Sequence, residues 1–205
     1  MSKPPIETGD AGRAFIAPFL SEILEKEANG MILSLVACPM FHYMFADDGD
    51  DDMARIKSQT ANAREYIVNI FREMYDKGHL IIGASIAQDA LLGWSLLFKP
   101  FSEQEAAYLH HIYVKEEFRG CGVGSELIHG CLAQYKKIGL MCEPQTVPFY
   151  QRFGLEVKGT MVPMPEVKSS FAYILLTLMS NCDNSGRLFL LSDEDLANIE
   201  RILKA

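Results

Sequence analysis

The chain has 205 residues and is 49% hydrophobic, so it is long enough to bury a sizeable core as one domain. Its formal net charge of -8 at pH 7 disfavours nucleic acid as a partner, because phosphate backbones bind basic surfaces. The charge suits a cationic ligand better, since an acidic surface steers cations towards a protein.

The sequence shows no feature of a secreted, membrane-bound or metal-binding protein. The opening residues MSKPPIETGD are polar and contain prolines, unlike a secretory segment. The longest apolar stretch, 80–98, is interrupted by Gln88-Asp89, which predicts two strands instead of a membrane span. The five cysteines are odd in number and lack CxxC spacing, which is typical of free thiols in a reducing cytoplasm. Because the histidines show no zinc-type spacing with them, we expect a cytoplasmic protein without metal.

The first third of the chain is predicted to be helical. Apolar residues at helical spacing predict helices over 15–29, 31–45 and 53–77. The first is expected to stop at Asn29-Gly30, the second to break near Pro39, and the third to end at Gly78. The acidic run at 47–52 is interpreted as a solvated loop, with a lip that attracts cationic substrates as the alternative.

A sheet is predicted to follow the helices. Its expected strands span residues 79–86, 91–98, 106–114, 139–142, 155–160 and 171–178. The first two form a hairpin that turns at Gln88-Asp89. The phrase LLGWSLL resembles a strand of the family named below, in which a glycine, here Gly93, marks a kink or bulge. Further helices are predicted over 125–137 and 147–153, and Ser192 is expected to cap a final amphipathic helix.

The segment RGCGVG, residues 119–124, joins the strand that ends at Val114 to the helix that follows. Alternate glycines let the backbone turn sharply and approach a ligand without an intervening Cβ. The first amides of a helix present unpaired N–H groups and a partial positive charge, and Arg119 adds a cation. The segment therefore predicts a phosphate or pyrophosphate site. A Walker loop would need a lysine after Gly124, and a dinucleotide fingerprint would need glycine in place of Ser125.

The pattern Q/R-x-x-G-x-G/A fits instead, through Arg119, Gly122 and Gly124. Together with Val114 and the later segment VPFYQRFGLEV at 147–157, it resembles the acyl-CoA loop of the GCN5-related N-acetyltransferase (GNAT) superfamily. A glycine-rich turn without a ligand is the alternative.

A finer resemblance, over 31–179, is to the puromycin N-acetyltransferase-like branch of that superfamily. It is carried by CPMF at 38–41 and by MPE at 164–166. The chain departs from this pattern in two ways. It has no clear first strand, and EPQTV at 143–147 stands where an asparagine is often found.

The resemblance implies an α/β fold with a mixed, mostly antiparallel central sheet flanked by helices and splayed beside its central strand. It implies one domain over 1–205, with a helical part at 1–78, a sheet and acyl-CoA core at 79–179, and a tail with a helix at 180–205. It also implies acetyl-CoA as the acyl donor and leaves a homodimer open. The residues that it assigns to acyl-CoA are Ile112, Tyr113, Val114, Arg119, Gly120, Cys121, Gly122, Val123, Gly124, Ser125 and Tyr150.

Strand alternation predicts that the side chains of the central strand divide between two faces. One face is expected to hold Tyr108, His110, Ile112 and Val114, and the other Leu109, His111 and Tyr113. By resemblance to arylalkylamine N-acetyltransferases, His110 and Tyr108 occupy the positions of a proton relay, with His110 as the base, directly or through water. A histidine hydrogen-bonded within the core is the alternative.

Tyr150 matches the family tyrosine that protonates the departing CoA sulfur, with a tyrosine that only packs the helix as the alternative. Proton transfer from a phenol to a thiolate is uphill by roughly 2 kcal/mol at ordinary pKa values. Either the pKa of Tyr150 is lowered, or the phenol mainly donates a hydrogen bond. A covalent route through Cys121 or Cys142 is disfavoured, because neither has a clear histidine partner and the family transfers directly in a ternary complex.

The sequence therefore predicts an N-acetyltransferase that moves an acetyl group from acetyl-CoA to a primary amine, most simply a small molecule. Two alternatives stay open. One is a protein acetyltransferase acting on lysines or N-termini, and the other is a non-catalytic CoA-binding regulatory module.

Overall fold

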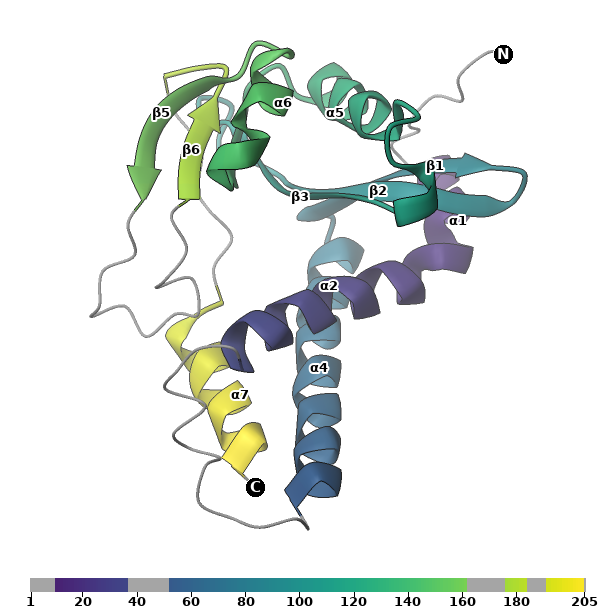
Figure 1. The fold of residues 1–205 in the computed structure, drawn as a ribbon, viewed down its shortest axis with the longest axis vertical. Helices are drawn as coiled ribbons and strands as arrows, with labels where there is room; N and C mark the ends of the chain where they lie inside the picture. The colour runs from purple at the N-terminus through teal and green to yellow at the C-terminus, as the bar shows by residue number, and fades with distance from the viewer. Residues whose placement is uncertain (1–9, 37–51, 162–175, 184–190, 205) are drawn as a thin grey trace. The chain divides into compact units, whose positions relative to one another are not determined.

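The computed structural model describes residues 10–36, 52–161, 176–183 and 191–204. Two compact units divide the chain (Figure 1). The first comprises Met1–Leu20, Tyr75–Val162 and Leu175–Phe189, and the second Ser21–Met74, Pro163–Ile174 and Leu190–Ala205. That the whole chain forms a single domain stays a prediction.

The first unit is built on a six-stranded sheet with the order β1-β2-β3-β4-β6-β5. Its strands are β1 (Leu80–Ala87), β2 (Ala90–Phe98), β3 (Ala107–Val114), β4 (Ile138–Cys142), β5 (Glu156–Met161) and β6 (Leu176–Ser180). Only the β3–β4 pair is parallel, and the other four pairs are antiparallel. The predicted mixed, mostly antiparallel sheet is confirmed.

Helix α5 (Val123–Gln134) follows β3, and α6 (Val147–Gln151) follows β4. In Figure 1 both lie on the same side of the sheet. Between α5 and the sheet lies a core of apolar side chains from α5, β2, β3, β4 and β6, among them Leu97, Leu109, Ile128, Leu140 and Met179, each at most 2% exposed. This core holds α5 at a fixed height above the central strands.

The β1–β2 hairpin turns where the sequence predicts it. Gln88 and Asp89 have φ values of 51° and 61°, so both adopt the left-handed conformation of a type I′ turn. Within β2, Gly93 lies very close to the backbone of the neighbouring strand β3. A Cβ placed on this glycine would stand 2.5 Å from the carbonyl oxygen of Tyr113. The pairing of β1 with β2 also shifts next to this glycine, between Ser85 and Ile86. The predicted irregularity at Gly93 is confirmed.

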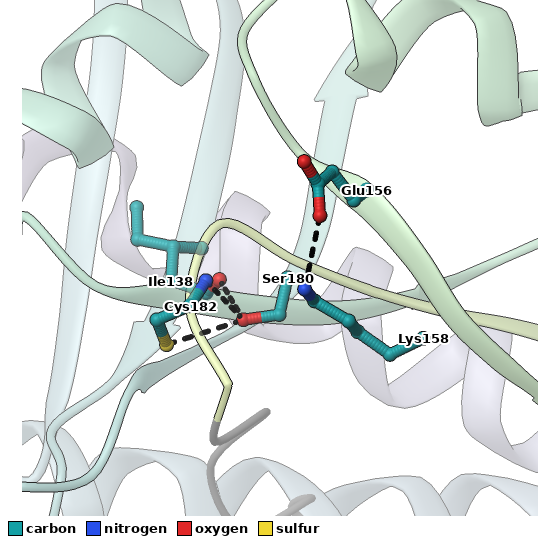
Figure 2. Close-up of polar contacts among 5 residues, drawn as sticks. All are labelled: Ile138, Glu156, Lys158, Ser180 and Cys182. Carbon is teal, nitrogen blue, oxygen red and sulfur yellow. Dashed lines mark hydrogen bonds and ion pairs between the residues drawn. The ribbon is translucent and has the colours of Figure 1, made fainter.

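The end of β6 is fastened to the start of β4 by side chains. Ser180 Oγ donates to the carbonyl oxygen of Ile138 at 3.0 Å and lies 3.3 Å from Cys182 Sγ (Figure 2). The amide of Asn181 accepts from the backbone N–H of Ile138 at 2.8 Å and donates to the carbonyl oxygen of Lys136 at 2.8 Å. This end of the sheet is therefore closed by hydrogen bonds in addition to the strand ladder.

Two short elements precede the second unit: α1 (Asp10–Ile16) and the 3-10 helix η1 (Ala17–Phe19). The second unit itself takes its helical content from α2 (Leu20–Val36), α4 (Asp52–Asp76) and α7 (Asp193–Lys204). The predicted stop at Gly30 is wrong, because α2 continues through this residue to Val36. The helix tolerates a glycine there at a cost of about 1 kcal/mol relative to alanine.

Side-chain hydrogen bonds join α4 to both of its partners in this unit. Arg64 donates to Asn29 of α2 at 3.3 Å. Tyr66 donates to Asp195 of α7 at 3.0 Å and accepts from Asn198 at 2.9 Å. The buried faces of the three helices are apolar at helical spacing, with Ile23, Leu24, Ala28, Ala63, Ile67, Phe71, Ile199 and Leu203 each at most 2% exposed.

Two other predicted helix boundaries agree with the structure, whereas the helices predicted over 125–137 and 147–153 span Val123–Gln134 and Val147–Gln151. Gly78, with φ 70°, follows the end of α4, and the hydroxyl of Ser192 accepts from the N–H of Asp195 at the start of α7. The break near Pro39, the acidic run 47–52, CPMF at 38–41, MPE at 164–166 and the first part of the last strand, 171–175, lie outside the described residues, apart from Asp52.

The close approach at Gly93 generates a stability prediction. Replacing Gly93 with alanine should lower the free energy of unfolding by about 1–3 kcal/mol, because the new Cβ must push β2 away from Tyr113. Urea unfolding measures the change. Gly30→Ala is the control: a Cβ there meets nothing within 4 Å, so the same substitution should stabilise the protein by up to about 1 kcal/mol. Equal effects of the two substitutions would contradict this account.

Candidate functional site

The candidate site begins where β3 and β4 separate. The two strands pair over only three positions, Ala107 with Ile138, Tyr108 with Gly139 and Leu109 with Leu140. Strand β3 continues for five residues to Val114, and in the described part of the chain no ladder pair joins it to β4 beyond Leu109. An extended ligand can therefore lie along this edge of β3, as in peptide or pantetheine binding by strand addition.

A β-bulge at His110 lies where this separation starts. Leu96 of β2 is opposite His111 and Leu97 is opposite Leu109, so His110 is an extra residue without an opposite residue on β2. A bulge reverses the alternation of side chains beyond it. Leu109 and Ile112, three residues apart, consequently pack against the same core under α5.

The predicted division of β3 into two faces is therefore wrong in part. Ile112 does not share a face with Tyr108 and His110. The methyl groups of Val114 also point towards α5, since a Cβ on Gly124 would stand 3.7 Å from Val114 Cγ2. Sequence alternation could not reveal this, because a bulge depends on how the neighbouring strand pairs.

Tyr108 and His110 do lie together. Their ring centroids are 5.9 Å apart, and Phe98 of β2 contacts both, at 6.4 Å from Tyr108 and 5.6 Å from His110. Tyr108 is 4% exposed and Phe98 7% exposed, whereas His111 is exposed. The sequence reasoning missed Phe98, because its place opposite Tyr108 depends on the pairing of β2 with β3.

Tyr150 on α6 lies close to this group. Burial raises its pKa well above that of a free phenol, and the nearby thiols of Cys142 and Cys131 raise it further. Burial also raises the pKa of Tyr108, and the Tyr150 phenol adds to that shift, so the two hydroxyls lie within electrostatic reach of each other. Both phenols hold their protons at neutral pH. The lowered pKa considered for Tyr150 is contradicted. Of the two catalytic roles considered for this phenol, only hydrogen-bond donation is compatible with the raised pKa.

The glycine loop lies at the far end of β3. A 3-10 helix, η2 (Glu116–Phe118), follows β3. In it the N–H of Phe118 donates a hydrogen bond to the carbonyl oxygen of Lys115 at 2.9 Å. Gly120 and Gly122 have φ values of 76° and 88°, a conformation that a side chain disfavours. Gly122 is also the N-cap of α5 and supplies no side chain to the first turn, so the first amides of this helix point outward without a capping group.

The side chains of Arg119 and Phe149 lie next to this loop. The guanidinium of Arg119 donates to the carbonyl oxygen of Val114 at 3.3 Å, so a cation is folded against the end of β3. A Cβ on Gly124 would stand 3.4 Å from the ring of Phe149, so glycine lets α5 approach α6 closely. Bare helix amides, glycines with positive φ and a nearby arginine form a cradle that fits a pyrophosphate.

The described thiols do not form a nucleophilic site. Burial raises the pKa of Cys131 to about 11, although the Ser95 hydroxyl at 3.4 Å opposes the shift. Burial also raises the pKa of Cys142. A thiol that stays protonated is a poor nucleophile, which argues against a covalent route through Cys142. Cys121 is exposed in the glycine loop, and no histidine contact accompanies it in the described residues.

Among the described residues, no three His, Cys, Asp or Glu side chains gather in a group that could hold a metal ion. None of the helices in that part of the chain has the length and apolar composition that a membrane crossing requires.

A protein-family model described as "Acetyltransferase (GNAT) family" matches residues 43–155, which is more than half of the chain. Solved structures with a similar fold include an acetyltransferase of the GNAT family from Streptococcus pneumoniae. It is 14% identical, with 57% of this chain and 74% of that chain covered and a TM-score of 0.44.

Two other solved structures are similar to the same extent. A GNAT family acetyltransferase from Elizabethkingia anophelis with acetyl-CoA bound is 17% identical, with coverage of 53% and 81% and a TM-score of 0.42. Arabidopsis thaliana Naa50 in complex with the bisubstrate analogue CoA-Ac-MVNAL is 19% identical, with coverage of 49% and 72% and a TM-score of 0.41.

The cradle generates a binding prediction with a matched pair of variants. Asparagine and aspartate both tolerate the left-handed conformation of Gly122 and have the same shape, but only aspartate brings a negative charge. Gly122→Asp should weaken acetyl-CoA binding by at least about tenfold relative to Gly122→Asn, because a carboxylate repels the pyrophosphate. Isothermal titration calorimetry measures both affinities. Equal affinities of the two variants would show that the pyrophosphate lies elsewhere.

Proposed function

The chain belongs to the acetyltransferase (GNAT) family, and from this premise we propose that it acetylates the primary amine of a small molecule. As a member of this family it is an enzyme that takes an acetyl group from acetyl-CoA. The observation that carries the proposal is the open edge of β3, which has the glycine cradle at one end and Tyr108, His110 and Tyr150 at the other. Acyl-CoA needs both features, one for its pyrophosphate and one for its thioester.

Acetyl-CoA fits this edge in one direction. Its pyrophosphate would lie on the amides from Gly122 to Ser125 beside Arg119, and its pantetheine arm along Ile112, Tyr113 and Val114. The thioester would then reach the point where β3 and β4 separate. Beyond Leu109 no ladder pair joins β3 to β4 in the described residues, and we assign to the backbone N–H groups of this stretch the stabilisation of the oxyanion that forms on the thioester carbonyl.

The acceptor must first lose a proton, because an alkylamine has a pKa of roughly 10.4 and is almost fully protonated at neutral pH. We assign the base to His110, acting directly or through water, with Tyr108 beside it. The ring contact between His110 and Tyr108 supports this role, and it lies at the residue where β3 and β4 separate. In direct transfer the amine nitrogen bonds to the thioester carbon, its proton passes to His110, and the C–S bond breaks.

Tyr150 is assigned to the departing sulfur. Its raised pKa makes full proton transfer to a thiolate uphill by more than roughly 2 kcal/mol, so the phenol acts mainly by donating a hydrogen bond as negative charge grows on sulfur. The influence of the Tyr150 phenol on the pKa of Tyr108 supports a donor close to the proposed relay. Free thiols that stay protonated favour this direct route over an acetyl-cysteine intermediate.

Two features favour a small amine as the acceptor. The net charge of -8 attracts cations, and the aromatic group around Tyr108 is buried, which suits an apolar amine better than an extended peptide. The segment VPFYQRF at 147–153, whose first five residues form α6, supports the puromycin N-acetyltransferase-like branch as the nearest group within the family.

Tyr150→Phe should lower kcat by about tenfold or more while acetyl-CoA affinity changes by less than about twofold, because the lost hydrogen bond forms chiefly as the C–S bond breaks. Steady-state kinetics and calorimetry separate the two effects. Tyr66→Phe is the matched control: it removes a hydroxyl with two hydrogen bonds on α4 and should leave kcat unchanged. An unchanged kcat in Tyr150→Phe would remove this residue from the mechanism.

The acceptor class is tested by mass spectrometry after incubation with acetyl-CoA and a pool of small amines and lysine peptides. We expect a gain of one acetyl group on a small amine. Acetylation of peptides alone would replace the proposal with a protein acetyltransferase.

A further inference from the structure

A cavity of about 500 Å³ lies at the closed end of the sheet, away from the site described above. The loop from β2 to β3 forms one wall, and the segment between α5 and β4 forms the other. The volume is within the range of roughly 300–1,000 Å³ in which proteins bind small molecules. We call it the Lys99 cavity, defined by Lys99, Phe101, Tyr135, Lys136 and Lys137.

Hydrogen bonds hold the backbone of both walls. Asn181 accepts from Ile138 and donates to the carbonyl oxygen of Lys136, and the N–H of Ala107 donates to the carbonyl oxygen of Lys137 at 2.9 Å. Ser180 reinforces the same segment through Ile138, as Figure 2 shows. In the other wall the N–H of Lys99 donates to His79 at 2.9 Å. The backbone of Lys99, Lys136 and Lys137 is therefore held in place, and Lys99 Nζ lies near Gly78, 3.6 Å from the position of a Cβ built on that glycine.

The loop that carries Phe101 is also shaped by hydrogen bonds. The N–H of Phe101 donates to a carboxylate oxygen of Glu105 at 3.3 Å, and the N–H of Glu105 donates to Ser102 at 3.1 Å. The side chain of Phe101 is nevertheless 75% exposed. A large aromatic ring held in water at the rim of a cavity costs free energy and offers a flat surface to a ligand.

The charges of the lining oppose those of the whole protein. Three lysines and two glutamates, Glu103 and Glu105, contribute to the cavity, and one of these glutamates is hydrogen-bonded to the loop. The cavity is therefore locally cationic on a chain with a net charge of -8. Its other walls, from Phe101, Pro100 and Tyr135, are apolar. This combination complements an anion with an apolar body.

We propose that the Lys99 cavity is a second ligand site, which binds a small anion with a flat apolar body, such as an aryl carboxylate. The acid group faces Lys99, Lys136 and Lys137, and the body stacks between Phe101 and Tyr135. This site is separate from the proposed acyl-CoA site. The cavity borders the start of β3 and the glycine cradle follows its end, and a strand of eight residues spans roughly 23 Å.

The test uses the full chain, labelled with ¹⁵N, and two probes of the same shape. One is 2-naphthoate and the other is its uncharged amide, 2-naphthamide. NMR titration should show saturable shifts at Phe101, Tyr135 and Lys136 with 2-naphthoate, at a Kd below about 1 mM. The amide should bind at least about threefold more weakly, because it lacks the charge that the lysines attract.

Variants then test the lysines directly. The triple variant Lys99→Gln, Lys136→Gln, Lys137→Gln should bind 2-naphthoate about tenfold more weakly, since each exposed ion pair contributes modestly. A control with the same loss of charge, Lys77→Gln, Lys158→Gln, Lys204→Gln, should stay within about twofold of the natural chain. Lysine-to-glutamine changes on the surface preserve the fold, which thermal unfolding of each variant verifies.

Several results would overturn the proposal. They are equal binding of the acid and its amide, equal binding by the two triple variants, or the absence of saturable shifts up to about 5 mM probe. Displacement of 2-naphthoate by saturating acetyl-CoA would assign the probe to the acyl-CoA edge and would also refute a separate site. Because no readout depends on turnover, failure here leaves the proposed acetyl transfer untouched.

Discussion

Strand β3 loses its neighbour on one side after Leu109, and the chemistry of this protein depends on that loss. Up to Leu109 the strand pairs with both β2 and β4, whereas beyond it only the ladder to β2 continues among the described residues. An extended ligand can lie along a strand edge where the neighbouring strand has turned away, which is why an acyl-CoA arm suits this stretch of β3.

The bulge and the open edge work together. An extra residue at His110 tightens the local twist and changes which side chains follow, so Ile112 and Val114 anchor the strand against α5 while Tyr108 and His110 stay beside Phe98. Burial at this point keeps phenols and thiols protonated, as the raised pKa values of Tyr108, Tyr150 and Cys131 indicate. Such a site favours hydrogen-bond donation to developing charge over prior ionisation of its own groups.

Much of this arrangement can be predicted from the residues. The helix that ends at Gly78, the hairpin turning at Gln88-Asp89 and the capped helix after Ser192 all follow from local rules, because turns and caps need particular side chains or glycine. The phosphate cradle follows in the same way from three alternate glycines before a helix. The continuation of α2 through Gly30 shows the limit of such rules, since packing of an apolar face outweighs the propensity of one residue.

The turns, the helix caps and the glycine loop were therefore determined by the sequence itself, because they depend on contacts between neighbours along the chain. The faces of β3, the approach of Phe98 to Tyr108 and His110, and the raised pKa of Tyr150 were decided only by the tertiary structure. The same holds for the Lys99 cavity, whose walls lie at least thirty positions apart in sequence. Strand register, burial and the meeting of distant loops arise from long-range packing, which alternation along a single strand does not encode.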